Sequence, residues 1–177
     1  MKANWVTLVS ACVVVVTLVF PRPSEVEAQN LNAQPLTANQ ERVVRVEVQA
    51  AFDQYYAWFS AGRADLVAKR AFLAPALFLR PAELEVSSST GALQSRYEAQ
   101  LKPLIADGYV KSEMPSPTIC VLNERTAMIS GRYLRYRRDG AVMGELGGTY
   151  IFAKASDGWR IVSVITHAPS KVVQCTN

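Results

Sequence analysis

The amino-acid sequence predicts an α+β domain, with helices in its first half and an antiparallel sheet in its second half. The pattern of apolar residues is mainly helical before residue 117, and apolar residues alternate with a period of two from residue 117 onward. Helices that precede an antiparallel sheet in this way cover one of its faces. The chain has 177 residues, half of them apolar, which is enough for a single domain with one core.

The first 28 residues are typical of a secretory signal peptide. Lys2 precedes an apolar run from Trp5 to Phe20, and residues 26–28 (VEA) end in a small residue that suits cleavage. A membrane anchor is the alternative, although this run is shorter than the ~17–25 residues of a spanning helix. We therefore predict export to the periplasm or out of the cell, with membrane contact only through this segment.

Residues 29–37 are predicted to be a flexible leader, and a capping box then starts the first helix. Thr37 and Gln40 have the spacing at which each side chain bonds the backbone N–H of the other residue. Gly62 is expected to end the helix in a left-handed conformation. The predicted buried stripe of this helix consists of Val44, Val48, Phe52, Tyr55 and Phe59.

Shorter elements are predicted between this helix and the sheet. Residues 64–72 read as a second helix, and residues 77–79 and 84–86 as two short strands. Ser88, Ser89 or Thr90 can cap a third helix that extends to about residue 105 and stops at Asp107-Gly108.

The rest of the chain is predicted to be an antiparallel meander. Turn-forming residues, among them Asp139-Gly140 and residues 156–158 (SDG), separate its β-rich segments. These segments are residues 118–122, 127–138, 144–153 and 159–167.

Two segments resemble the nuclear transport factor 2-like superfamily, which includes ketosteroid isomerase and the SnoaL-like polyketide cyclases. Residues 54–65 (QYYAWFSAGRAD) look like its first helix and glycine turn, and residues 157–162 (DGWRIV) like its usual ending. The resemblance spans residues 38–169 and leaves residues 170–177 as a C-terminal tail. It implies a cone-shaped roll, with three helices on a curved, mostly antiparallel sheet around a pocket. It also implies a homodimer that pairs through the outer sheet face.

The same resemblance gives Tyr55 and Arg80 contrasting roles, and the sequence adds His167 as a candidate base. Tyr55 falls where ketosteroid isomerase has a hydrogen-bond donor, whereas Arg80 stands where that enzyme has its carboxylate base. A guanidinium keeps its proton and cannot serve as a base. His167 is the only histidine and shares the parity of Trp159 and Ile161, so it is a candidate acid or base at the pocket. The alternative is a structural histidine at the end of a strand.

We predict an electropositive pocket in which Arg80 holds a carboxylate of the ligand. The competing expectation is that Arg80 pairs with Glu83 and leaves an apolar cavity. The predicted pocket residues are Tyr55, Arg80, Tyr133, Arg135, Tyr150 and His167.

Three functions remain open. The first is an exported protein that binds a partly apolar small molecule, which can be anionic, without catalysis. The second is a SnoaL-like isomerase, cyclase or dehydratase that uses Tyr55 and His167. The third is a secreted protein-interaction module that uses the basic hairpin at residues 135–139.

Cofactors and nucleic acid are not expected as partners. The sequence contains no phosphate-binding glycine motif and no Cys/His metal-ligand spacing, so we predict neither a cofactor nor a metal. A net charge of +4 is too small to indicate nucleic acid. After export, Cys120 and Cys175 are the remaining cysteines and are candidates for a disulfide, with two free thiols as the alternative.

Overall fold

A capping box starts helix α1 (Ala38–Ser60) in the computed structural model, which describes residues 35–175. The predicted signal peptide and most of the predicted leader lie outside the described residues. Gln40 N–H donates to Thr37 Oγ1 (3.3 Å), and Thr37 N–H donates to Gln40 Oε1 (2.9 Å). Gly62 follows the helix with a φ of 70°, as expected of its stop residue. The buried residues of α1 are those of the predicted stripe, Val44, Val48, Phe52, Tyr55 and Phe59.

The chain after α1 departs from the predicted second helix. One helical turn, α2 (Ala64–Leu66), leads into a π-helical segment, η1 (Val67–Ala71), and strand β1 (Phe72–Arg80) begins where the helix was expected to continue. The strand therefore extends five residues further toward the N-terminus than predicted and includes Pro75. Helix α3 (Thr90–Ala106) has Ser89 as its N-cap, which is one of the three residues predicted for that role.

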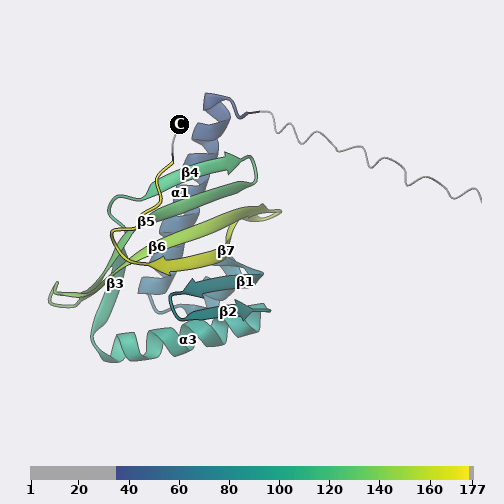
Figure 1. Ribbon diagram of the computed structural model, residues 1–177. Coiled ribbons are helices and arrows are strands. Elements are labelled where there is room, and N and C mark those ends of the chain that lie inside the picture. Colours follow the sequence, from purple (N-terminus) through teal and green to yellow (C-terminus); the bar gives the residue numbers. More distant parts are fainter. Residues whose placement is uncertain (1–34, 176–177) are drawn as a thin grey trace, which may run out of the picture. The chain divides into compact units, whose positions relative to one another are not determined.

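A seven-stranded mixed sheet forms the other layer of the domain, with α1 and α3 on one side of it (Figure 1). The strand order is β2-β1-β7-β6-β5-β3, and β4 pairs with the remaining length of β5. All neighbouring strands are antiparallel except β1 and β7. The other strands are β2 (Glu83–Ser87), β3 (Tyr109–Glu113), β4 (Thr118–Asn123), β5 (Thr126–Arg137), β6 (Val142–Ala155) and β7 (Gly158–His167).

Strand β3 was not predicted from the sequence. Its two buried residues, Tyr109 and Ser112, are three positions apart because the register with β5 shifts between Tyr109 and Lys111. This irregularity removes the alternation of apolar and polar residues by which a short strand is recognised.

A β-bulge at Val162 divides β7 into two halves of opposite parity. Ile161 pairs with Phe152 and Ser163 pairs with Ile151, so Val162 has no partner of its own on β6. Before the bulge, Ile161 points toward the helices, and after it Val164 does so. One extra residue therefore reverses the faces of all residues that follow it in the strand.

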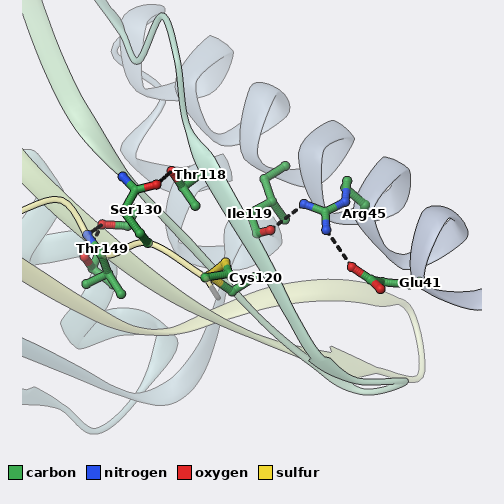
Figure 2. Close-up of a disulfide and its surroundings, with 10 residues drawn as sticks. Glu41, Arg45, Thr118, Ile119, Cys120, Ser130 and Thr149 are labelled. Carbon is green, nitrogen blue, oxygen red and sulfur yellow. Dashed lines mark hydrogen bonds and ion pairs between the residues drawn. A yellow bond between two sulfur atoms is a disulfide. The ribbon is translucent and has the colours of Figure 1, made fainter. Parts of the chain in front are cut away.

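Residues 168–175 follow β7 and cross the sheet on the face opposite the helices (Figure 1). We use the name C-terminal tail for these described residues, which begin two positions before the predicted tail at residues 170–177. A disulfide between Cys120 on β4 and Cys175 fixes its end, which confirms the predicted pairing (Figure 2). Val173 N–H donates to Ser130 Oγ at 3.0 Å, and Ser130 is fully buried. The tail thus covers polar groups of the sheet that would otherwise be exposed.

The inner face of the sheet and the two long helices enclose the hydrophobic core. Its largest fully buried side chains include Phe152, Leu93 and Ile129, which come from β6, α3 and β5. This arrangement confirms the predicted α+β class, in which helices pack on a curved, mostly antiparallel sheet as a cone-shaped roll. Within residues 35–175, no helix combines the length and apolar character needed to cross a membrane.

Candidate functional site

A cavity of about 540 Å³ lies between the inner face of the sheet and helices α1 and α3. Its volume falls within the ~300–1,000 Å³ range of small-molecule sites. Its wall combines aromatic rings with three arginines, Arg80, Arg96 and Arg135. The seven aromatic side chains that line it are Tyr55, Tyr56, Phe59, Phe78, Tyr97, Tyr133 and Tyr150.

The tyrosine hydroxyls of this cavity are held in the neutral form. Burial raises the pKa of Tyr55 from its ordinary value of 10.0 to about 12. Burial also raises the pKa values of Tyr56, Tyr97 and Tyr150 well above the ordinary value. The hydroxyls of Tyr56 and Tyr150 lie 3.3 Å apart, within hydrogen-bond distance. The cavity therefore presents neutral O–H groups, which can donate as well as accept hydrogen bonds.

The buried tyrosines predict a loss of stability at alkaline pH. The unfolded chain ionises its phenols from about pH 10, whereas the native state keeps Tyr55 protonated until about pH 12. We expect the free energy of unfolding to be independent of these groups below pH 10 and to fall as the pH rises through this window. Urea unfolding monitored across this range, with Tyr55→Phe as the comparison, measures the effect. A variant that loses as much stability as the wild-type protein would contradict this assignment for Tyr55.

Two of the three arginines in the cavity wall are paired with acidic residues. Arg80 bonds Glu83 (3.2 Å) and Glu85 (3.3 Å), which is the competing arrangement considered from the sequence, and its side chain is 42% exposed. Glu85 also forms an ion pair with Arg96 (3.2 Å). The Arg96 guanidinium stacks 3.7 Å from the ring centre of Phe78. Glu85 thus pairs with both Arg80 and Arg96 in the cavity wall.

Arg135 has no such partner. Its Nε is buried and makes no hydrogen bond to any residue in the range 35–175, and no carboxylate of that range lies within ion-pair distance. The guanidinium carbon lies 5.4 Å from the ring centre of Tyr133 and 5.9 Å from that of Phe59. Its positive charge lowers the pKa values of Tyr55 and Tyr56, against the larger effect of burial. Among the described residues, Arg135 is therefore the cavity arginine without an acidic partner, whereas the sequence pointed to Arg80.

Five of the six predicted pocket residues line the cavity, and His167 does not. The bulge at Val162 places Thr166 toward the cavity and His167 on the outer face of the sheet, where its ring lies over Gly147. The sequence predicted that His167 would face the cavity with Trp159 and Ile161, which would be true only of a strand without a bulge. Tyr55 and His167 consequently lie on opposite faces.

Both ring nitrogens of His167 are used in the structure. Nδ1 lies 2.9 Å from the Ala168 carbonyl oxygen, which can only accept, so Nδ1 carries the proton. In the neutral ring, Nε2 then accepts from Thr149 Oγ1 at 2.9 Å. Thr149 Oγ1 lies 2.7 Å from Ser130 Oγ, which receives the N–H of the C-terminal tail. These contacts match the alternative expectation of a structural histidine.

Sequence reasoning missed the contribution of α3 and β2 to the cavity. Arg96 and Tyr97 come from α3, and Glu85 comes from β2. The available signal was the helical spacing of Leu93, Tyr97 and Leu101, which are the buried residues of α3. Within residues 35–175, no group of three or more His, Cys, Asp or Glu side chains is arranged to hold a metal ion.

The cone-shaped sheet, its covering helices and the enclosed cavity define an NTF2-like protein. Residues 46–169 match the family model described as NTF2-like protein (DUF6841), and the chain belongs to this family. The comparison with curated proteins found no match.

Solved structures share the fold at low sequence identity. An NTF2-like protein with a cystatin-like fold from Novosphingobium aromaticivorans has a TM-score of 0.62 at 17% identity, covering 78% of this chain and 92% of that one. Aln2 from a Streptomyces species has a TM-score of 0.59 at 17% identity, with coverage of 72% and 92%. A candidate calcium/calmodulin-dependent protein kinase II association domain from Xanthomonas campestris has a TM-score of 0.56 at 22% identity, with coverage of 71% and 88%.

Proposed function

We propose that this protein is an exported small-molecule-binding protein whose cavity takes a partly apolar ligand. The observation that carries this proposal is the cavity of about 540 Å³ with seven aromatic rings in its wall. Aromatic side chains supply a large apolar contact area, while the tyrosine hydroxyls and the arginines supply polar contacts that orient a ligand. The positive charge of the wall supports a ligand with an anionic group.

The catalytic alternative receives less support from the geometry. It depends on Tyr55 and His167 acting across one cavity, but these residues lie on opposite faces of the sheet. Arg80 cannot replace the missing base, because a guanidinium stays protonated at any working pH. A binding protein requires no base, so the same cavity suits this function as it stands.

The proposal of a protein-interaction module also receives less support, because the hairpin at residues 135–139 presents less basic surface than its sequence suggested. Arg135 faces the cavity, and Arg137 donates to Asp107 Oδ2 at 2.7 Å. Of the arginines in the hairpin at residues 135–139, Arg138 is the one that is exposed and makes no ion pair within the described part of the chain.

A substitution that fills the cavity tests the binding proposal. Val164 lines the cavity and pairs with Phe78 and Tyr150, so Val164→Phe is expected to place an extra ring among them. Small molecules that co-purify with the wild-type protein, identified by mass spectrometry, should be depleted at least tenfold in this variant. Ile165→Phe is the matched control, because the neighbouring side chain faces the opposite side of β7. An unchanged set of co-purifying molecules in Val164→Phe, or none in either protein, would count against the proposal.

Export remains a proposal supported by the disulfide, since disulfides persist mainly in oxidising compartments. The processed protein would begin near Gln29, which the mass of the native protein tests; recovery of intact Met1 in membranes would favour an anchor.

The predicted homodimer also remains a proposal. The outer face of β1 and β2 carries an apolar patch, in which Leu77 pairs with Val86 and Leu79 with Leu84. Leu84 is 67% exposed and Val86 is 59% exposed. Contiguous apolar surface of this kind often marks a protein interface. Light scattering tests this proposal, and a monomeric mass at micromolar concentration would contradict it.

A further inference from the structure

We propose that the cavity selects an aromatic monocarboxylate and binds its carboxylate at Arg135. This inference rests on the proposed function and names the class of ligand. Arg135, the charges around the cavity and the aromatic cavity wall together define the chemistry of this ligand.

Arg135 carries a positive charge without an acidic partner within residues 35–175. A guanidinium removed from water loses hydration that only a partner can restore, and buried charges in proteins are therefore paired. Arg135 is partly buried, and its Nε, like that of Arg96, is buried without a hydrogen-bond partner within residues 35–175. Arg96 Nε still lies 3.2 Å from a Glu85 carboxylate oxygen, whereas no carboxylate of that range lies within ion-pair distance of Arg135. Carboxylates form two parallel hydrogen bonds with a guanidinium, which fixes the position and the plane of the bound group.

Positively charged side chains outnumber negatively charged ones around the cavity. Arg80, Arg96 and Arg135 contribute three positive charges, while Glu83 and Glu85 engage only Arg80 and Arg96. One positive charge is left, and it belongs to Arg135. A ligand with a single negative charge completes the balance, whereas a second negative charge would lie near Glu85 without a free cation.

A neutral polar side chain, that of Ser112, lies beside Arg135. Ser112 on β3 is its direct partner across the strands and also lines the cavity. The Ser112 hydroxyl lies 2.7 Å from that of Tyr109, and both side chains are buried. A carboxylate on Arg135 would therefore have neutral hydroxyl groups on its other side and no competing negative charge.

The apolar part of the cavity wall is mainly aromatic. Seven aromatic rings line the cavity, whereas its aliphatic lining consists of Leu146, Val164 and Ala99. Aromatic rings pack with one another in edge-to-face and offset arrangements that add attraction beyond the buried area. Tyr133 and Phe59, which flank the guanidinium, would contact a ring attached directly to the carboxylate. A flat aromatic acid fits this wall better than a flexible fatty acid.

Isothermal titration with three probes tests the inference: 2-naphthoate, its neutral amide 2-naphthamide, and decanoate. We expect 2-naphthoate to bind the wild-type protein more tightly than either of the other two. Arg135→Met should weaken 2-naphthoate binding by about 10- to 100-fold, as expected for loss of hydrogen bonds to a charged group. The same variant should leave 2-naphthamide binding nearly unchanged. Arg138→Met is the matched control, because Arg138 is exposed, lies outside the cavity wall and removes the same charge from the same hairpin, so it should change 2-naphthoate affinity by less than about threefold.

Thermal unfolding of the ligand-free variant provides a second measurement. Arg135→Met replaces a partly buried cation, whose buried Nε has no hydrogen-bond partner within residues 35–175, with an apolar side chain, so its midpoint should equal or exceed that of the wild-type protein. A lower midpoint would mean that Arg135 has a structural partner, and the inference would be wrong.

The other outcomes separate this inference from the proposed function. Equal binding of 2-naphthoate and 2-naphthamide, unaffected by Arg135→Met, would overturn the carboxylate site while a binding cavity remained. Decanoate binding as tight as that of 2-naphthoate would overturn the aromatic selectivity. Failure of all three probes would overturn the inference, whereas the proposed function would still be decided by the molecules that co-purify with the wild-type and Val164→Phe proteins.

Discussion

Removal of the Cys120–Cys175 disulfide is expected to lower the free energy of unfolding by about 4 kcal/mol, because it joins cysteines 55 positions apart. The cross-link restricts the unfolded chain, and the loss of that restriction favours unfolding. The measurement is urea unfolding of the oxidised protein, of the reduced protein and of a Cys120→Ala/Cys175→Ala variant.

The two ways of removing the disulfide control for each other. Reduction leaves both thiols in place, whereas the double substitution removes them, so agreement between them isolates the effect of the cross-link. Alanine is preferred to serine because Cys120 is only 5% exposed, and a hydroxyl there would be buried. An unchanged urea midpoint after reduction would show that the cross-link does not stabilise the fold.

Phe152→Ala is expected to lower the free energy of unfolding by about 3–5 kcal/mol, the usual cost of deleting a buried aromatic side chain. Phe152 is 1% exposed and packs edge-to-face against Phe52 of α1, with 6.2 Å between the ring centres. The substitution leaves a cavity between the sheet and α1, and chemical unfolding measures its cost.

Ile151→Ala is the matched control for Phe152→Ala. The two residues are adjacent on β6, but Ile151 faces the outer side of the sheet and is only partly buried. Ile151→Ala is expected to lower the free energy of unfolding by less than half as much as Phe152→Ala, because fewer contacts are lost and water can enter the space. Equal losses at the two positions would contradict the assignment of the inner face of β6.

The sequence predicts best where the structure is regular. The stripe of α1 repeats at helical spacing without interruption, and a capping box and a glycine mark its two ends, so its buried residues could be named individually. The four β-rich segments of the second half correspond to β4, β5, β6 and β7, because turn residues separate them. Periodicity and turn residues are local features, so they can be recognised in a single sequence.

The errors occur where the backbone is irregular or where a contact is tertiary. A register shift hides β3, and the bulge at Val162 moves His167 to the outer face. Arg135 was predicted at the cavity, but that it lacks an acidic partner depends on where Glu85 lies. Glu85 on β2 pairs with Arg80 on β1 and Arg96 on α3, and such a contact between distant segments cannot be recognised from the spacing of residues in the sequence.

The bulge in β7 also determines where the chain can change its length. Deletion of Val162 would remove the unpaired residue, restore a regular ladder with β6, and keep residues 163–167 on the faces that they now occupy. An insertion or deletion elsewhere in the strand would exchange those faces and turn the cavity wall outward. In evolutionary terms, position 162 is the site in β7 where a relative one residue shorter can keep the same cavity.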